Sequence, residues 1–217
     1  RIMKVMMGHD FKGEIYPISR SSDEVMGLKA YPTISDVPGH VDLAILINPA
    51  QFVPDTLREG GMKGVKAAQI ITSGFAEEIG EDGARQQAKI REIAEEFDMA
   101  ICGPNSEGFA NTQAALCPTF SPAVDENDEP LMPDYRKNGH ISAIAQSGGV
   151  GFSFFDRGRP KELPFNYILT TGNEAALEEL DFVDHLLDTG ETDIFLLFME
   201  DIKTPEKLAK VGEKALR

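Results

Sequence analysis

The sequence predicts an α/β fold made of two successive units in which strands and helices alternate. Short apolar runs of strand length recur along the chain, and amphipathic stretches of helical period separate them. Most of the apolar runs end in small polar residues or glycine. Alternation of this kind is typical of parallel, doubly wound sheets with right-handed crossovers, which bind ligands beyond the carboxyl ends of their strands.

The composition is that of an acidic globular protein. Of the 217 residues, 41% are hydrophobic and 26% are charged, and the formal net charge is −15. This charge argues against a nucleic-acid partner, because no cluster of basic residues is available to displace counterions. No apolar run has the length of a membrane span and no signal peptide is visible, so we expect no membrane partner. Cys102 and Cys117 lack the spacing of a disulfide framework, which indicates a cytoplasmic protein.

The first unit opens with residues that have the pattern of a helix end, Arg1–Gly8, and continues with an expected strand at Glu14–Ile18. A βαβ pattern that opens on a helix lacks its first strand and first glycine loop. We therefore expect the chain to be a fragment, or to have a leading segment that is not seen.

Three apolar strands follow in the first unit, at Val41–Ile47, Ala67–Thr72 and Met99–Cys102. The near-continuous apolar character of the first of them predicts that both of its faces are covered. A helix is expected to begin near Val53–Pro54 and to stop at Gly60–Gly61. A second helix is expected at Asp82–Phe97, and its inner face is predicted to consist of Ala84, Ala88, Ile90, Ile93, Ala94 and Phe97.

A stretch rich in proline and acidic residues, Ser121–Asn138, interrupts the alternation and is predicted to connect two domains. A second α/β unit follows it and again ends on a helix. Its expected strands are Ile141–Ala145, Asn166–Thr170 and Ile194–Met199, and its expected helices are Gly149–Gly158, Ala175–Leu187 and Thr204–Leu216.

The turn after the strand Ile141–Ala145 is the strongest local indication of a binding site. It consists of Gln146, Ser147, Gly148 and Gly149, and a helix with apolar Val150, Phe152, Phe154 and Phe155 is expected to follow. A strand, a glycine turn and a helix in this order leave N–H groups open at the helix N-terminus, where an anion can bind. The same residues also fit a tight turn with no ligand.

Several known motifs are missing or incomplete. Neither GxGxxG nor GxxxxGK[ST] occurs, so the sequence provides no dinucleotide fingerprint and no P-loop. The stretch from Ala145 to Gly149 approaches the GxSxG elbow of hydrolases, but alanine replaces its first glycine and His185 is the only histidine downstream. His9, His40, His140 and His185 have no metal-ligand spacing, and we expect no metal site.

Across nearly its whole length the chain resembles the nucleoside-diphosphate-forming acyl-CoA synthetases of the acetate–CoA ligase type, relatives of the succinyl-CoA synthetase α-subunit. Each motif is weak alone, but the order and spacing of the whole set are specific. The motifs are Tyr16-Pro17 with Arg20, Gly27–Pro32, Asn48-Pro49-Ala50, Gly64-Val65-Lys66, Ile70–Phe75, Gly103–Gly108, Gln146–Gly149, Gly172-Asn173-Glu174 and Glu200.

The resemblance implies a CoA-binding Rossmann-like domain at residues 1–123, a linker at 124–136 and a flavodoxin-like CoA-ligase domain at 137–217. It implies a phosphate site at Ser147, Gly148 and Gly149, and a contact from Glu200 to a phosphorylated histidine. Arg20 matches a position that is usually basic and suits a phosphate of CoA. The implied CoA-binding residues are Pro17, Ser19, Arg20, Asn48, Pro49, Ile71, Thr72, Ser73, Asn105 and Ser106.

The reaction implied by the resemblance joins a small carboxylate to CoA at the expense of ATP, by way of an acyl phosphate and a phosphohistidine. The family's first glycine loop and its phosphoryl-carrying histidine have no match in this chain. ATP or ADP with Mg is expected at an ATP-grasp domain or subunit that is not part of the chain, and a homo-oligomer is possible. We therefore expect these 217 residues alone to be inactive.

Two alternatives remain. In some relatives this architecture is fused to an acetyltransferase and serves as a CoA-sensing regulatory module that is no longer catalytic. The other alternative, a nicotinamide-dependent dehydrogenase, requires an acidic residue at the end of the second strand. The chain has Arg20 there, which counts against NAD.

Overall fold

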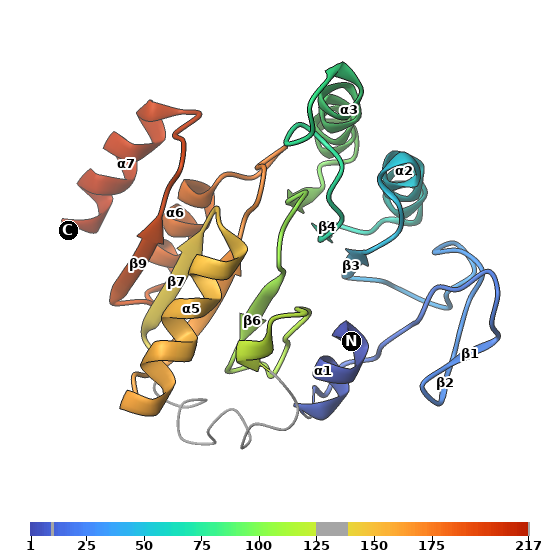
Figure 1. The fold of residues 1–217 in the computed structure, drawn as a ribbon, viewed down its shortest axis with the longest axis horizontal. Helices are drawn as coiled ribbons and strands as arrows, with labels where there is room; N and C mark the ends of the chain where they lie inside the picture. Colours follow the sequence, from blue (N-terminus) through green and yellow to red (C-terminus); the bar gives the residue numbers. More distant parts are fainter. Residues whose placement is uncertain (10, 125–138, 217) are drawn as a thin grey trace.

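The structure is a computed structural model that describes residues 1–9, 11–124 and 139–216. Its strands form two main sheets, one with the order β3-β4-β5 and one with the order β6-β8-β7-β9 (Figure 1). The strands of the first sheet are β3 (Leu43–Leu46), β4 (Ala67–Ile70) and β5 (Ala100–Cys102). Those of the second are β6 (Phe109–Asn111), β7 (Ile141–Ala145), β8 (Phe165–Thr170) and β9 (Ile194–Phe198).

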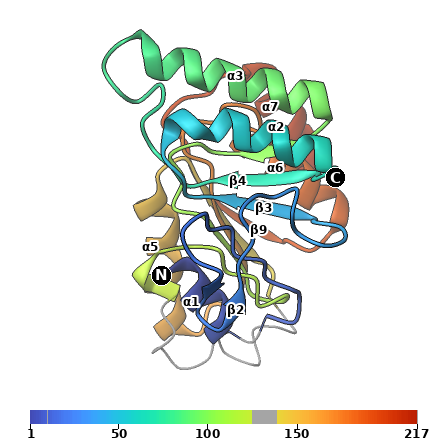
Figure 2. The same ribbon diagram turned by 90° about the vertical axis from the view of Figure 1, so that its right-hand side faces the viewer.

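The first sheet is parallel, as predicted, and both of its crossover helices lie on one face (Figure 2). These helices are α2 (Val53–Lys63), which follows a short 3-10 turn η1 (Ala50–Phe52), and α3 (Glu81–Phe97). The strand order rises steadily along the chain, so right-handed crossovers place both helices on the same side. The expectation that β3 is covered on both faces is wrong for the described residues, since three of its four residues remain partly exposed.

Helix α2 continues through Gly60 and Gly61, so the predicted stop at these glycines is wrong. The helix ends at Gly64, which adopts a left-handed conformation with φ of 93°. Gly61 lies against the ring of Phe97 in α3, where an added Cβ would come within 2.4 Å of the ring. Close approach of two helices therefore explains a glycine that looked like a helix terminator.

Two further expectations for the first unit are wrong. Ala84 and Ala88 are exposed, while Ile90 and Ile93 are the fully buried residues of α3. The segment Glu14–Ile18 is irregular and forms one isolated bridge, from Ile18 to Tyr31. Pro17 lies in this segment and has no N–H, so it cannot donate to a strand ladder.

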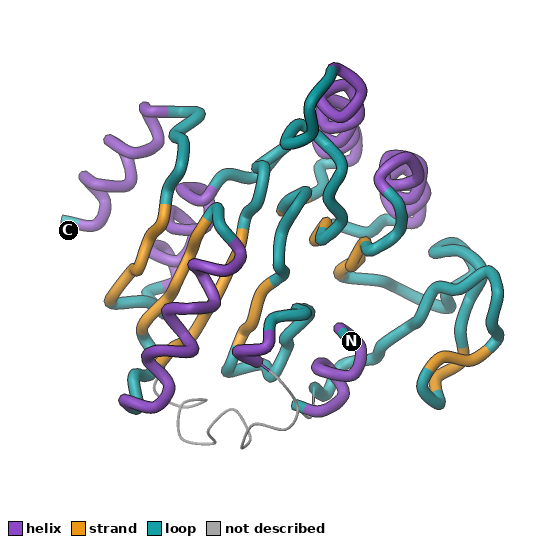
Figure 3. Tube along the Cα trace, in the orientation of Figure 1, coloured by secondary structure: helices purple, strands orange, loops and turns teal. Residues whose placement is uncertain are grey.

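The second sheet carries helices on both faces. Helix α5 (Gly148–Gly158) covers one face, and α6 (Glu179–Thr189) and α7 (Pro205–Ala215) cover the other (Figure 3). Strands β7, β8 and β9 are parallel, while β6 pairs with β8 in the antiparallel sense. Sequence periodicity did not indicate β6, because a three-residue strand is too short to show alternation.

A backbone ladder joins the two sheets. The N–H groups of Asn173, Ala175 and Leu177 donate to the carbonyls of Pro104, Gly103 and Ile101, at 2.9, 2.9 and 3.1 Å. The segment before α6 therefore runs along the free edge of β5. This explains why α6 begins at Glu179 and not at Ala175, where a helix start was expected.

The N-terminal helix α1 (Ile2–Gly8) also reaches the second sheet. Val5 packs in the apolar cluster that contains Ala110 of β6, Phe152 of α5 and Ile168 of β8. A small hairpin, β1 (Glu24–Val25) with β2 (Leu28–Lys29), lies at the outer side of the first sheet (Figure 1). Two short 3-10 turns, η2 (Pro122–Val124) and η3 (Arg159–Lys161), complete the described elements.

The domain limits at residues 123 and 137 stay a prediction, and apart from Val124 the predicted linker 124–136 lies outside the described residues. Within the described part of the chain, no helix is long and apolar enough to cross a membrane. Among the same residues, no three His, Cys, Asp or Glu side chains gather into a group that could hold a metal ion.

Candidate functional site

Three loops meet at the carboxyl end of the first sheet. The hydroxyl of Thr72, two residues after β4, donates to the carbonyl of Asn48 after β3 at 2.8 Å. The carbonyl of Thr72 in turn accepts the N–H of Asn105 after β5 at 2.9 Å. The structure therefore brings the predicted Asn48, Thr72 and Asn105 into one continuous surface. Their neighbours Pro49 and Ser73 are exposed on it, and Ile71 is anchored by its N–H to the carbonyl of Leu46 at 3.0 Å.

The predicted CoA residues Pro17, Ser19 and Arg20 lie on the segment that leads to the β1–β2 hairpin. Tyr31 holds this segment, because its N–H donates to Pro17 and its carbonyl accepts from Ser19, both at 2.9 Å. Pro17 is buried, whereas the Arg20 side chain is exposed and makes no ion pair with a described residue. Among the described residues, no hydrogen bond connects these three residues to Asn48, Thr72 or Asn105.

Ser106 is a buried junction between the two sheets. Its hydroxyl accepts hydrogen bonds from Gln69 of β4 at 2.8 Å and from the N–H of Gly108 at 2.9 Å, and it donates to the carbonyl of Thr170 at 2.6 Å. One donor and two acceptor positions exhaust what a hydroxyl offers. In this structure the Ser106 hydroxyl therefore holds the chain between β5 and β6, and its predicted contact with CoA stays a prediction.

The predicted phosphate-binding residues lie at the N-terminus of α5. Ser147 is the N-cap residue, yet its hydroxyl makes no capping hydrogen bond, so it leaves the first N–H groups of the helix to another partner. Glu107 packs directly beside them. A Cβ added at Gly148 would lie 2.6 Å from the Cβ of Glu107 and 2.8 Å from its Oε2. An acidic side chain thus borders the N-terminal turn of α5, which is a place that favours negative charge.

Glu200 follows β9 and is exposed, and its backbone is anchored by the side chain of Gln146. The Gln146 Oε1 accepts the N–H groups of Glu200 and Asp201, at 2.6 and 2.9 Å. The Gln146 Nε2 donates to the carbonyl of Asp201 at 2.6 Å and to Oε2 of Glu174 at 3.0 Å. The site that includes Ser147 thereby gains Glu200 from a strand more than fifty residues away in sequence.

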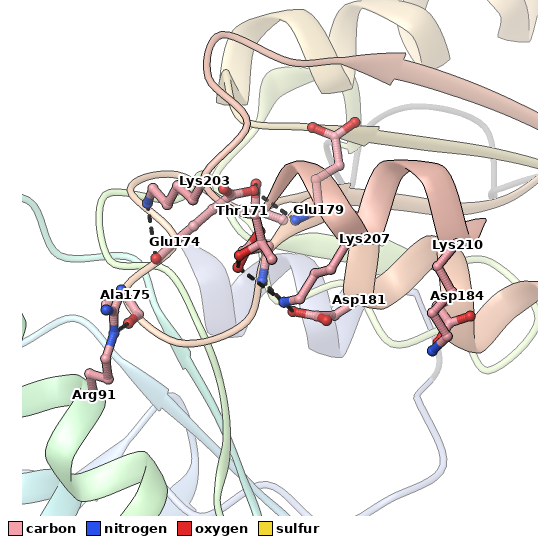
Figure 4. A network of polar contacts seen from close by, with 12 residues as sticks. Arg91, Thr171, Glu174, Ala175, Glu179, Asp181, Asp184, Lys203, Lys207 and Lys210 are labelled. Carbon is pink, nitrogen blue, oxygen red and sulfur yellow. Dashed lines mark hydrogen bonds and ion pairs between the residues drawn. The ribbon is translucent and has the colours of Figure 1, made fainter. Parts of the chain in front are cut away.

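A buried polar network supports this arrangement (Figure 4). Glu174 is 2% exposed, and its Oε1 accepts hydrogen bonds from the Thr171 hydroxyl at 2.9 Å and from the Glu179 N–H at 2.7 Å. Burial raises the pKa of the Glu174 carboxyl, and these hydrogen bonds oppose the shift. Lys203, whose pKa is lowered by burial, donates to the carbonyls of Asn173 and Glu174.

Glu179 stands apart within this network. Its side chain is 2% exposed, and neither carboxyl oxygen has a hydrogen-bond partner. Burial and the nearby charge of Glu174 raise the pKa of Glu179 to about 8. The Phe198 backbone lies near enough to offset part of that shift but not to form a hydrogen bond. The next acid along the chain, Glu178, differs from Glu179 because it is paired with Lys207 at 3.0 Å.

Sequence reasoning missed four side chains of this site: Glu107, the amide of Gln146, Glu174 and Lys203. Glu107, Gln146 and Glu174 stand in motifs that were quoted for the resemblance, and each follows the end of a strand. That position was the signal available for them. No sequence signal indicated Lys203, because its hydrogen-bond partners come from another loop. Cys102 offers no nucleophile, since burial raises its thiol pKa to about 12.

Two protein-family models match the chain. The model described as a CoA binding domain matches residues 1–112, and the model described as a succinyl-CoA ligase like flavodoxin domain matches residues 138–217. Both matches agree with the order of domains expected from the resemblance.

Curated relatives and a solved structure are similar over nearly all of the chain. The α-subunit of acetate–CoA ligase (ADP-forming) II from Pyrococcus furiosus is 37% identical and covers 94% of the chain, which spans 42% of that relative. An ADP-forming acetate–CoA ligase from Methanocaldococcus jannaschii is 36% identical over 94% of the chain and 27% of its own length. The dinucleotide forming acetyl-coenzyme A synthetase 1 of Candidatus Korarchaeum cryptofilum, in complex with phosphate and ADP, is 29% identical, with a TM-score of 0.86 over 99% of the chain and 44% of the solved one.

The chain thus spans less than half the length of each of these relatives. Its domain order, its fold and its sequence agree with theirs. The chain belongs to the family of nucleoside-diphosphate-forming acyl-CoA synthetases, of which it carries the CoA-binding domain and the succinyl-CoA ligase-like flavodoxin domain.

Proposed function

We propose that this chain is the CoA-binding and phosphate-site portion of an ADP-forming, or more generally NDP-forming, acyl-CoA synthetase. The reaction converts a small carboxylate, CoA and ATP into acyl-CoA, ADP and phosphate, through an acyl phosphate and a phosphohistidine. In this proposal residues 1–123 form the CoA-binding domain, 124–136 the linker and 137–217 the ligase domain. The observation that carries it is the meeting of the strand-end loops of both sheets across Asn105 and Gly172, in a chain whose relatives are named as ADP-forming CoA ligases.

In this proposal the loops of the first sheet bind CoA, and those of the second sheet bind the phosphoryl group. The surface of Pro17, Ser19, Arg20, Asn48, Pro49, Ile71, Thr72, Ser73, Asn105 and Ser106 would hold CoA, whose thiol attacks the acyl phosphate. Ser147, Gly148 and Gly149 would bind the transferring phosphoryl group through helix N–H groups, which stabilise charge without reorganising. Glu200 would contact the imidazole that carries the phosphoryl group.

The phosphoryl-carrying histidine, the ATP-grasp domain and its Mg-bound nucleotide lie outside these 217 residues in the proposal. Of the four histidines, His40 and His185 are exposed, and His9 is 4% exposed with its ring near the Val124 carbonyl. His140 precedes β7, at the opposite end of that strand from Ser147. We place the enzyme in the cytoplasm because Cys102 and Cys117 lack the spacing of a disulfide framework.

The test is a pair of measurements on the full-length protein. Calorimetry with CoA and with NAD measures ligand choice, and a coupled assay measures ADP formed from ATP, CoA and a panel of carboxylates. We expect CoA binding, no NAD binding, and carboxylate-dependent ADP formation with an acid-labile phosphohistidine. CoA binding without any such turnover would favour the alternative function, a CoA-sensing regulatory module that is no longer catalytic. Failure to bind CoA would overturn the proposal.

A further inference from the structure

Gln146 occupies the point where three strands of the second sheet end. Its N–H donates to the carbonyl of Phe198 at the end of β9 (3.0 Å), and its carbonyl accepts the N–H of Gly172 after β8 (3.2 Å). Ser147, the N-cap of α5, is the next residue. The backbone of Gln146 is therefore fixed to both neighbouring strands before the chain enters the phosphate-binding turn.

The side chain of Gln146 uses every hydrogen-bonding position that it has. Two N–H donors meet Glu174 and the Asp201 carbonyl, and two acceptor positions meet the N–H groups of Glu200 and Asp201. A primary amide has two donors and two lone pairs, so the set is saturated. Such a side chain stabilises one loop conformation, because any other conformation leaves a polar group without a hydrogen-bond partner.

Glu174 determines which way the Gln146 amide faces. Its Oε2 lies 3.0 Å from Nε2, and an ionised carboxylate can only accept. A flipped amide would place its oxygen against the carboxylate and its NH2 group against the N–H groups of Glu200 and Asp201. The Thr171 hydroxyl and the Glu179 N–H hold Glu174 itself in place.

The Glu200 carboxylate makes no hydrogen bond or ion pair with any residue that the structure describes. Its position therefore depends on its backbone, which Gln146 anchors. We propose that Gln146 is a positioning residue that fixes Glu200 relative to the Ser147 turn, with Glu174 orienting its amide. This rests on the proposed function, in which Glu200 contacts the phosphorylated histidine.

The first arm of the test measures geometry and does not depend on activity. Residue-resolved hydrogen–deuterium exchange on the full-length protein should show protected amides at Glu200 and Asp201. In Gln146→Met, an apolar side chain of similar length, exchange at these two amides should become at least about tenfold faster. The matched control is Gln113→Glu, at an exposed glutamine, which should leave both rates unchanged. Unchanged rates in Gln146→Met would overturn the anchoring.

The second arm measures the consequence for the reaction. Gln146→Met should lower kcat by about tenfold or more, because a misplaced group loses catalytic effect steeply with distance, while KM for CoA changes less than twofold. Val183→Ala, in the core of α6, is the control for destabilisation, since a structural loss of similar size should leave kcat unchanged. A double variant, Gln146→Glu with Glu174→Gln, restores a donor opposite an acceptor and should recover kcat relative to Gln146→Glu alone.

The two arms separate the inference from the proposed function. Faster exchange with an unaltered kcat would overturn the positioning role. If the wild-type protein forms no acyl-CoA, the proposed function fails, and the exchange rates still confirm or overturn the anchoring of Glu200 by Gln146.

Discussion

The carboxyl ends of the two sheets are built in different ways. At the first sheet, main-chain carbonyls and one hydroxyl join the loops, and Pro49, Ser73 and Asn105 remain exposed. At the second sheet, the side chains of Gln146 and of the buried Glu174 also join the loops, and the buried acid Glu179 lies beside them. The end of the first sheet is therefore an open surface suited to a large ligand. The end of the second sheet is a site whose loops are held in one geometry.

The strongest way to break the relation between the two ends is to separate them at Gly172. Its φ is 59°, and an added Cβ would lie 2.2 Å from the carbonyl oxygen of Pro104. We expect Gly172→Ala to cost about 3 kcal/mol or more in the free energy of unfolding, measured by urea denaturation. Gly190→Ala is the matched control, because its φ is 66° with no atom within 4 Å. It should cost about 1 kcal/mol, and equal losses would refute the clash.

Glu179→Gln tests how the buried carboxyl at the end of the second sheet affects the stability of the protein. The pKa of Glu179 is raised from 4.5 to about 8, so the folded state keeps a proton that the unfolded chain releases. This contribution to stability is complete below the unfolded pKa and is lost as pH rises toward 8. We expect Glu179→Gln to raise the free energy of unfolding by about 2 kcal/mol more at pH 8.5 than at pH 6.5, from urea midpoints.

Its neighbour Glu178 serves as the control of opposite sign. Burial acts to raise the pKa of Glu178, but hydrogen bonds from Thr204 and Lys207 outweigh it, and the pKa is lowered. Stability from Glu178 is therefore present above its unfolded pKa and is lost as pH falls. Glu178→Gln should destabilise the protein at pH 8.5, and a gain there would contradict this account of the network.

Glu107→Gln sharpens the comparison at the helix N-terminus. Removing a negative charge beside Gly148 should strengthen phosphate binding about fivefold, since helix-terminus and exposed charge effects are each near 1 kcal/mol. Titration of the full-length protein with inorganic phosphate, followed by 31P NMR, measures it. Glu92→Gln, an exposed acid of α3, should leave the affinity unchanged. Weaker binding in Glu107→Gln would argue against an anion site in this turn.

The smallest expected effect lies on the open surface. Arg20 is exposed, and Arg20→Glu should weaken CoA binding about threefold to tenfold in calorimetry, as for a solvent-screened ionic contact. Dephospho-CoA should lose less if Arg20 meets the 3′-phosphate, whereas equal losses would place it at the diphosphate. Arg157→Glu, on the exposed side of α5, provides the control.

Sequence reasoning identified the local features and missed the long-range ones. The strand β7 was predicted with its observed bounds, and the start of α2 was predicted within a residue, because apolar runs and prolines act locally. Gly61 and the segment before α6 were misread, since a neighbouring helix and the edge of β5 decide their conformation. Local periodicity carries no information about such partners.

The same division holds for the candidate site. Small polar residues and glycine after strands marked Asn48 and Ser147, because the required backbone geometry limits residue choice, and the family resemblance added Thr72. The polar network of Gln146, Glu174 and Lys203 was not predicted, because the hydrogen-bond partner of each member lies on a loop that is distant in sequence. Whether Arg20, Ser106 and Glu200 contact ligands stays a prediction.

The ladder along β5 bears on how the protein unfolds. Asn173, Ala175 and Leu177 complete hydrogen bonds that an edge strand leaves open, and the guanidinium of Arg91 in α3 adds a contact to the Ala175 carbonyl at 2.9 Å. Pulling the halves apart would expose all of these groups at once. We therefore expect the two units to unfold in one cooperative transition, with a single melting temperature for both of them.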